Sequence, residues 1–155
     1  MDSMHWRPHS RELRKGRVST PGHVYLVTST THHRRPLFRD IAIGRLLVRE
    51  MRCLVEESAV DSLAWVVMPD HFHWLFGLKA GTLHASMRRL KSRSAIAVNR
   101  FIGESGRVWQ AGYHDHALRA EEDIKDVAQY IVANPLRARL VTRIGDYPLW
   151  DAAWL

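Results

Sequence analysis

Residues 64–76 constrain the fold more than any other part of this 155-residue chain. Two runs of β-branched and aromatic residues flank the dipeptide Pro69-Asp70, a composition that predicts two strands joined by a tight turn. His71 and His73 open the second strand. Because successive strand side chains point to opposite faces, we expect both imidazoles on one face and the intervening aromatic residues on the other.

The expected histidine face suits a divalent metal ion, because imidazole nitrogens are common metal ligands. A pair of histidines near a strand end also occurs as ordinary surface or hydrogen-bonded residues. The spacing alone leaves both interpretations open. A second pair with the same spacing, His114 and His116, is an alternative that the hairpin by itself does not exclude.

The charge balance favours an acidic partner. The chain carries 23 Lys and Arg against 16 Asp and Glu, a formal net charge of +7. Nucleic acid is the usual partner of such an excess, since Lys and Arg contacts to phosphate release counterions; a merely soluble basic surface is the alternative. No apolar run reaches the ~18 residues of a membrane span, and the N-terminus lacks the pattern of a secretory signal. We therefore expect a cytoplasmic protein with no membrane partner.

Residues 1–20 are expected to form a basic arm, because they combine many cations with little apolar periodicity. Arg14, Lys15 and Arg17 are its candidate contacts to DNA. A solvated segment fits the same composition equally well. Residues 21–155 then form a single domain, long enough to bury one core.

The order of elements predicts an α+β fold of the ferredoxin-like or RRM-like type, with an antiparallel sheet and packed helices. Asp40 suits the N-cap of the first helix, and Pro135 is expected to end the last one. We expect the first strand to pair with the histidine strand in the middle of the sheet. The expected elements are a strand at 23–30, a helix that follows Asp40 and runs to about residue 58, the hairpin, a helix at 83–101, a strand or irregular strand at 108–119 and a helix at about 121–134.

The second helix carries a basic face. Arg89, Arg93 and Arg100 lie within about 40° of one another around its axis, beside the apolar stripe. Such a face suits contacts with successive phosphates. An ordinary solvated helix face explains the pattern nearly as well.

The third helix places Tyr130 and Asn134 one turn apart, beside its apolar stripe. If it packs on the histidine face, a phenol and an amide oxygen join two imidazoles, and such a set leaves open positions on a divalent cation for a phosphate oxygen. Tyrosine is a weak nucleophile at its usual pKa of about 10, so attack on phosphorus needs this electrostatic help. Spacing alone favours a packing tyrosine and a helix-capping asparagine.

Two motifs together resemble the REP-associated tyrosine transposases, relatives of the single-tyrosine HUH transposases of insertion sequences. They are Met-Pro-Asp-His-Phe-His-Trp-Leu at residues 68–75 and Tyr-Ile-Val-Ala-Asn-Pro-Leu-Arg-Ala-Arg-Leu-Val at residues 130–141. The resemblance covers about residues 20–150 and implies the HUH nuclease fold. One departure is Arg139, which stands where the family pattern has glycine and could change a turn or a DNA contact.

The resemblance implies a catalytic site with Tyr130 as nucleophile and with His71, His73 and Asn134 as ligands of Mg²⁺ or Mn²⁺. It implies an enzyme that cuts and rejoins single-stranded DNA at REP-type palindromic hairpins through a 5′-phosphotyrosine intermediate, as a monomer or a homodimer. Two alternatives remain. One is a hairpin DNA- or RNA-binding protein that does not cut, and the other is a metal-dependent phosphodiesterase that uses water as its nucleophile.

Overall fold

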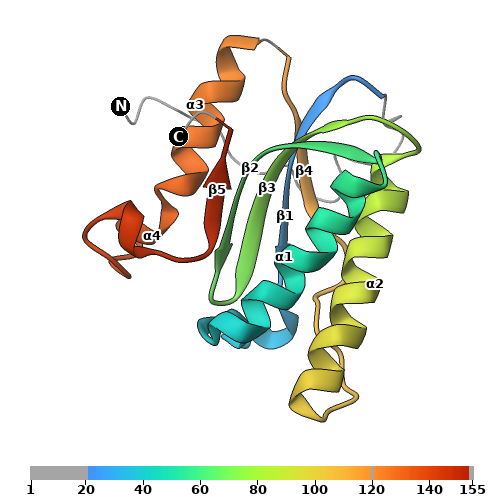
Figure 1. Cartoon of the computed structure of the whole chain (residues 1–155), viewed down its shortest axis with the longest axis vertical. Coiled ribbons are helices and arrows are strands. Elements are labelled where there is room, and N and C mark those ends of the chain that lie inside the picture. The colour runs from blue at the N-terminus through green and yellow to red at the C-terminus, as the bar shows by residue number, and fades with distance from the viewer. Residues whose placement is uncertain (1–20, 120, 154–155) are drawn as a thin grey trace.

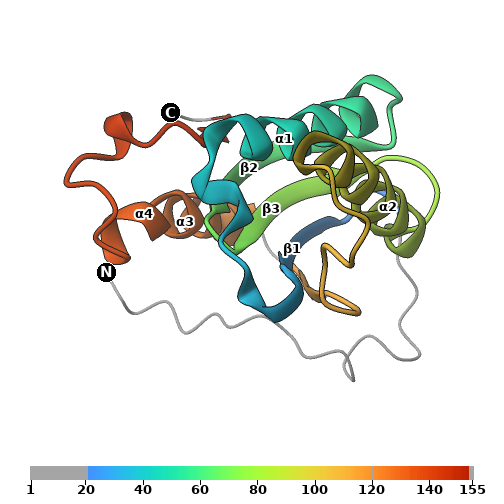
Figure 2. The same cartoon turned by 90° about the horizontal axis from the view of Figure 1, so that it is seen from below.

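The structure, a computed structural model, describes residues 21–119 and 121–153. It is a five-stranded sheet with helices on both faces (Figures 1 and 2). The predicted arm contacts Arg14, Lys15 and Arg17 lie outside the described residues. In the part of the chain that is described, no helix is long and apolar enough to cross a membrane.

The sheet is antiparallel, with the strand order β4-β1-β3-β2-β5. This order and the packed helices confirm the predicted ferredoxin-like α+β fold. The histidine strand β3 lies at the centre of the sheet and pairs with β1, so that Thr28 lies opposite His73. The strands are β1 (Val24–Thr30), β2 (Val60–Met68), β3 (His71–Leu78), β4 (His114–Ala117) and β5 (Trp150–Ala152).

Two longer helices, α1 (Ile41–Glu56) and α2 (Leu83–Ile102), cover one face of the sheet (Figure 2). Both begin with a side-chain cap, because an oxygen of Asp40 accepts from the Ala42 N–H at 2.9 Å and the Thr82 hydroxyl accepts from the Ala85 N–H at 3.0 Å. The other face is covered by α3 (Glu121–Val132) and the short α4 (Asn134–Arg137).

The alternation of β3 divides the core between the two faces. Phe72, Trp74 and Phe76 are fully buried in the cluster that α1 and α2 complete. Leu75 points the other way and packs with Ile131 and other apolar residues of α3. The predicted separation of aromatic and histidine side chains is thereby confirmed, and the histidines share a face with α3.

The structure differs from the predicted elements in three places. Of the strand expected at 108–119, only β4 forms a ladder, while the preceding residues are fixed by single bonds such as Gln110 N–H to the Thr30 carbonyl at 2.9 Å. The edge strand β5 was not predicted, because three residues carry too little alternation to detect. Pro135 does not end the third helix: α3 ends at Val132, and Pro135 lies in the first turn of α4, where its missing N–H costs nothing.

Candidate active site on the central strand

The two histidines of β3 lie side by side on the sheet face that α3 covers. Their ring centres are 5.0 Å apart, with the ring planes at 82°. Both side chains are partly buried at the end of the strand where the β2–β3 turn begins. The two imidazoles of this strand therefore lie close enough together to bind one ligand.

Each ring is held at Nδ1 by an oxygen from a neighbouring residue. Nδ1 of His73 forms a hydrogen bond of 2.7 Å with the Thr28 hydroxyl, across the β1–β3 pair. Nδ1 of His71 donates to a carboxylate oxygen of Asp70 at 2.7 Å. Histidines that bind metals are commonly fixed in this way, because the second nitrogen sets the tautomer and the ring orientation. A metal bound by these two rings would therefore use Nε2 of each.

Asp70 belongs to the candidate site, although the sequence pattern predicted only that it lies in a turn. Its second carboxylate oxygen accepts from Nε of Arg34 at 3.1 Å. Burial acts to raise the pKa of Asp70, but the hydrogen bond and charge of His71, together with Arg34, lower the pKa below its ordinary value. Asp70 is therefore ionised at neutral pH and can orient His71.

His73 is neutral at physiological pH. Burial lowers its pKa to about 3, and the positive charges of His71 and Arg137 act in the same direction. A metal binds only the unprotonated ring nitrogen, so no proton has to leave His73 before a cation is bound.

Tyr130 and Asn134 reach this face from the last turn of α3 and the first residue of α4. The two helices pack on β2, and α3 also contacts β3. The amide nitrogen of Asn134 donates to the Ile131 carbonyl at 3.1 Å, which makes the amide oxygen the atom available as a ligand. Tyr130 is half-buried beside the apolar face of α3.

Arg137 is a site residue that the spacing argument missed. Its guanidinium carbon lies 3.9 Å from the centre of the Tyr130 ring, and Nη2 donates to the Tyr130 carbonyl at 2.7 Å. The Arg in the Asn-Pro-x-Arg sequence was the available signal, but its partner became visible only with the break between α3 and α4.

The donor set fits a hard divalent cation. Among the described residues, no three His, Cys, Asp or Glu side chains come together, so a third ligand has to be of another type. The amide oxygen of Asn134 is such a donor, and oxygen ligands suit Mg²⁺ and Mn²⁺. The alternative pair lies farther out, since His114 is on β4 opposite Thr28, with β1 between it and His73.

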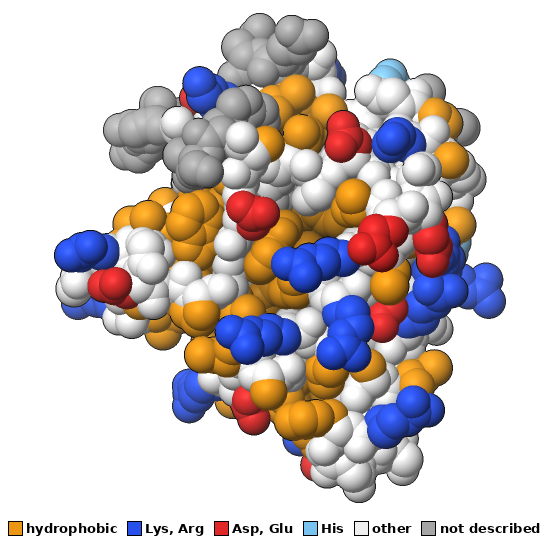
Figure 3. Space-filling view, viewed as in Figure 1, with side chains coloured by type: hydrophobic (Ala, Val, Ile, Leu, Met, Phe, Trp, Pro, Cys, Tyr) orange, Lys and Arg blue, Asp and Glu red, His pale blue; other side chains and the backbone are white. Residues whose placement is uncertain are grey.

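The predicted phosphate contacts lie on the other side of the sheet. Arg89 and Arg93 of α2 both form ion pairs with Glu57, which follows α1, and Arg100 lies two turns farther along the helix. Basic side chains with some acidic neighbours gather over α1 and α2 (Figure 3). Helix α2 itself contains no Asp or Glu. The structure therefore separates these arginines from the histidine site by the thickness of the sheet.

Comparisons with known proteins agree with this fold. Residues 19–134 match the family model described as "Transposase IS200 like". Because this match covers most of the chain, the chain belongs to the IS200-like transposase family.

Two relatives are more specific. The REP-associated tyrosine transposase of Escherichia coli (strain K12) is 30% identical over 87 residues, which are 55% of this chain and 50% of that protein. The match therefore spans only half the length of this curated relative. A solved structure of the REP-associated tyrosine transposase bound to a REP hairpin is similar in fold, with a TM-score of 0.72, 23% identity, and coverage of 86% of this chain and 79% of that chain.

Proposed function

We propose that this protein is a metal-dependent single-strand DNA endonuclease and strand transferase that acts through Tyr130. The observation that carries the proposal is the pair of imidazoles on β3, each held at Nδ1, on the face covered by the helix of Tyr130. Membership of a transposase family supports DNA as the substrate. The fold shared with a transposase that is bound to a REP hairpin supports a palindromic hairpin.

His71, His73 and Asn134 hold Mg²⁺ or Mn²⁺ in this proposal. A cation held by these residues would polarise the scissile phosphate and stabilise the charge that develops on it. The neutral state of His73 and the fixed tautomer of His71 keep both ring nitrogens ready as ligands. Thr28 and Asp70 do not bind the cation in this proposal; they orient His73 and His71 through their hydrogen bonds to Nδ1.

Tyr130 supplies the nucleophile. Its phenol oxygen forms a bond to phosphorus, the bond from phosphorus to the 3′-oxygen breaks, and the phenol proton is finally carried by the departing 3′-hydroxyl. The products are a 5′-phosphotyrosine and a free 3′ end. Attack by a 3′-hydroxyl on the phosphotyrosine reverses each of these changes, so strands are rejoined without a nucleotide cofactor.

Backbone contacts to the DNA fall to the basic groups away from the site. The proposal assigns them to Arg89, Arg93 and Arg100 on α2 and to Arg14, Lys15 and Arg17 of the arm. Such contacts are independent of sequence and weaken with salt.

Covalent trapping tests the proposal. Single-stranded hairpins from palindromic repeats of the source genome, labelled at the 5′ or 3′ end, are incubated with Mn²⁺, Mg²⁺ or chelator and separated on denaturing gels. We expect a metal-dependent adduct that carries the 3′-labelled fragment with wild-type protein, and none with Tyr130→Phe. Tyr113→Phe, a matched loss of one phenol on the opposite face, keeps the adduct.

Other outcomes identify the alternatives. Cleavage without an adduct that survives in Tyr130→Phe indicates a phosphodiesterase that uses water. Tight hairpin binding without cleavage in any metal indicates a binding protein on the same fold. Either result overturns the proposal.

A further inference from the structure

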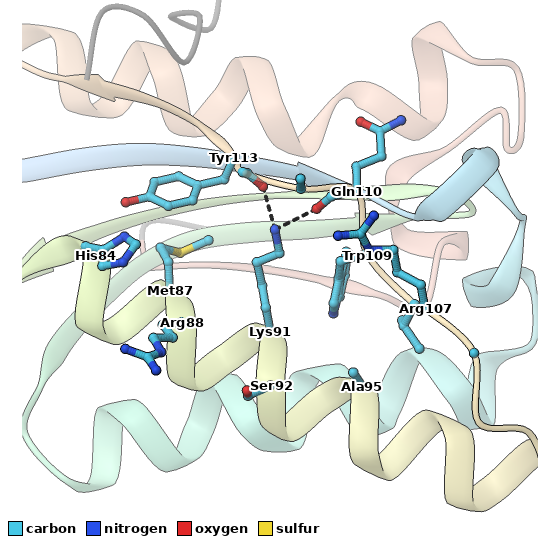
Figure 4. Close-up of a pocket in the computed structure, with 14 residues that line it drawn as sticks. His84, Met87, Arg88, Lys91, Ser92, Ala95, Arg107, Trp109, Gln110 and Tyr113 are labelled. Atoms are coloured by element: carbon cyan, nitrogen blue, oxygen red, sulfur yellow. Dashed lines mark hydrogen bonds between the residues drawn. The ribbon is translucent and has the colours of Figure 1, made fainter. Parts of the chain in front are cut away.

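A pocket lies on the face of the sheet opposite Tyr130, between α2 and residues 106–113, the segment that leads into β4 (Figure 4). Its volume is about 550 Å³. This size falls in the range of cavities that bind small molecules and cofactors.

The lining of this pocket is basic. His84, Arg88 and Lys91 come from α2, Arg107 comes from the opposite wall, and none of the lining residues carries a carboxylate. Figure 4 shows His84 at one end of the pocket and Arg107 at the other. A ligand here meets several donors and cations, which favours an anion such as a phosphate group.

The pocket also has an aromatic and apolar part. Tyr113 and Met87 lie at the His84 end, while Trp109 contributes to the floor (Figure 4). The Trp109 side chain is fixed, because Nε1 donates to the Ser94 hydroxyl at 3.0 Å and the ring packs edge-on against Phe72 at 5.5 Å. Flat side chains beside cations are the combination that binds unpaired bases together with their backbone.

Lys91 holds the two walls of the pocket together. Its ammonium group donates to the carbonyl of Gln110 at 2.9 Å and to that of Gly112 at 2.5 Å, which ties the 106–113 segment to α2. The same segment is bonded to β1, where Gln110 N–H donates to Thr30, the residue opposite His71. The 106–113 segment thus connects the pocket with the end of the sheet that holds the histidines.

We propose that this pocket binds one unpaired nucleotide of a single-stranded DNA. The base packs against Tyr113 and Met87, and the adjoining phosphate is bound by Arg107. The choice of DNA rests on the function proposed above. The binding itself requires neither the metal nor Tyr130.

Equilibrium binding of a labelled, unstructured oligothymidylate tests this site. All variants are made in the Tyr130→Phe background and measured by fluorescence anisotropy in chelator, so cleavage does not contribute. We expect Tyr113→Ala to weaken binding about tenfold, and Tyr113→Phe to bind like the parent because the ring is kept. Arg107→Gln, an exposed change, weakens binding and lowers the salt slope by about one. Arg49→Gln, an exposed arginine of α1 outside the pocket, serves as the charge control.

Photocrosslinking gives a second readout that does not depend on the stability of a variant. An oligonucleotide with a 5-iodouracil base is irradiated with the Tyr130→Phe protein, and the modified peptide is identified by mass spectrometry. We expect the crosslink on residues 106–113 or on Met87. Crosslinks found only elsewhere, together with unchanged binding by Arg107→Gln, overturn the proposal.

The two proposals fail independently. If wild-type protein forms no tyrosine adduct but the pocket variants lose oligothymidylate binding, only the proposed function fails. If the adduct forms and the pocket variants bind like the parent, only the nucleotide pocket fails.

Discussion

The guanidinium of Arg137 lies over the ring of Tyr130, 3.9 Å from its centre, while Nη2 of the same side chain holds the Tyr130 carbonyl at 2.7 Å. The two contacts bridge the break between α3 and α4. They fix a positive charge on the face of the proposed nucleophile. A phosphate that approaches the phenol oxygen therefore meets this charge as well.

Replacement of Arg137 is expected to slow DNA cleavage more than it weakens DNA binding. A cation over an aromatic ring contributes about 0.5–2 kcal/mol, so Arg137→Gln lowers the single-turnover rate about tenfold. Arg137→Lys recovers part of the rate, because the charge returns without the planar fork. Arg139→Lys, on an exposed neighbour, is the control. A wild-type rate for Arg137→Gln contradicts a positioning role.

Thr28→Val is expected to weaken metal binding about 10–100-fold, the usual effect of removing a residue that orients a histidine ligand. The change removes the hydroxyl that holds Nδ1 of His73 and keeps a β-branched residue in β1. Mn²⁺ titration by calorimetry measures the affinity directly. Thr28→Ser keeps the hydroxyl and should bind like wild type; equal weakening in both variants would indicate a packing effect.

The stability of the metal-free protein is expected to fall in mild acid because of His73. Its pKa is lowered to about 3 in the folded protein, against about 6.5 in an unfolded chain. Between these values the unfolded state binds a proton that the folded state excludes, so the free energy of unfolding falls by up to about 1.4 kcal/mol per pH unit as the pH drops. Asp70 acts in a lower range, since its stabilisation is present above its unfolded pKa of about 4.

Urea unfolding in chelator at about pH 6.5 and about pH 5 checks the sign of this effect. His73→Gln, which carries no titratable ring, should lose less stability than wild type between the two conditions. The same loss in both proteins would mean that His73 takes up its proton without cost to the fold.

Much of the fold followed from local patterns. The alternation around His71 and His73 predicted which face each side chain occupies, and the predicted cap at Asp40 lies where the first helix begins. These features depend on residues close together in the sequence. They are kept in the folded protein because the tertiary packing buries the same faces that the local sequence pattern marks as apolar.

The rest of the site depends on register, which the sequence does not display. Thr28 meets His73 only because β1 pairs with β3 in one particular alignment. Arg137 reaches Tyr130 only because the helix is interrupted at Ala133, between α3 and α4. Residues 108–113 were expected to belong to a strand or irregular strand, and the role of the 106–113 segment as a pocket wall comes from the long-range hydrogen bonds of Lys91.

Glu57 is expected to compete with DNA for Arg89 and Arg93, since it forms ion pairs with both side chains. If these arginines contact phosphate, Glu57→Gln should raise the affinity for hairpin DNA and steepen its salt dependence, while the Arg89→Gln, Arg93→Gln double variant lowers the slope by about two. Anisotropy titrations over a range of salt concentrations measure both. Glu56→Gln, one residue earlier, controls for net charge. Equal affinities for the two glutamate variants would exclude α2 from the DNA contact.

Arg139 adopts a left-handed conformation, with φ of 59°, at the end of α4. The N–H of Arg139 bonds to the Leu136 carbonyl at 3.0 Å and the N–H of Leu140 to the Pro135 carbonyl at 2.9 Å. This pair of bonds is the Schellman motif, in which glycine is the preferred residue at the position of Arg139. Glycine, which the resemblance implies at this position, would therefore have a conformational advantage, and this chain carries the strain of a side chain there.

Arg139→Gly is accordingly expected to stabilise the protein by about 0.5–1 kcal/mol, the usual difference between glycine and another residue at positive φ. For a chain of this length, a gain of that size raises Tm by about 1–4 °C. Arg139→Ala removes the same charge and long side chain but keeps the Cβ atom, so it should leave Tm nearly unchanged. If both variants are stabilised equally, the cost at this position comes from the charge of Arg139 among its basic neighbours and not from its backbone conformation.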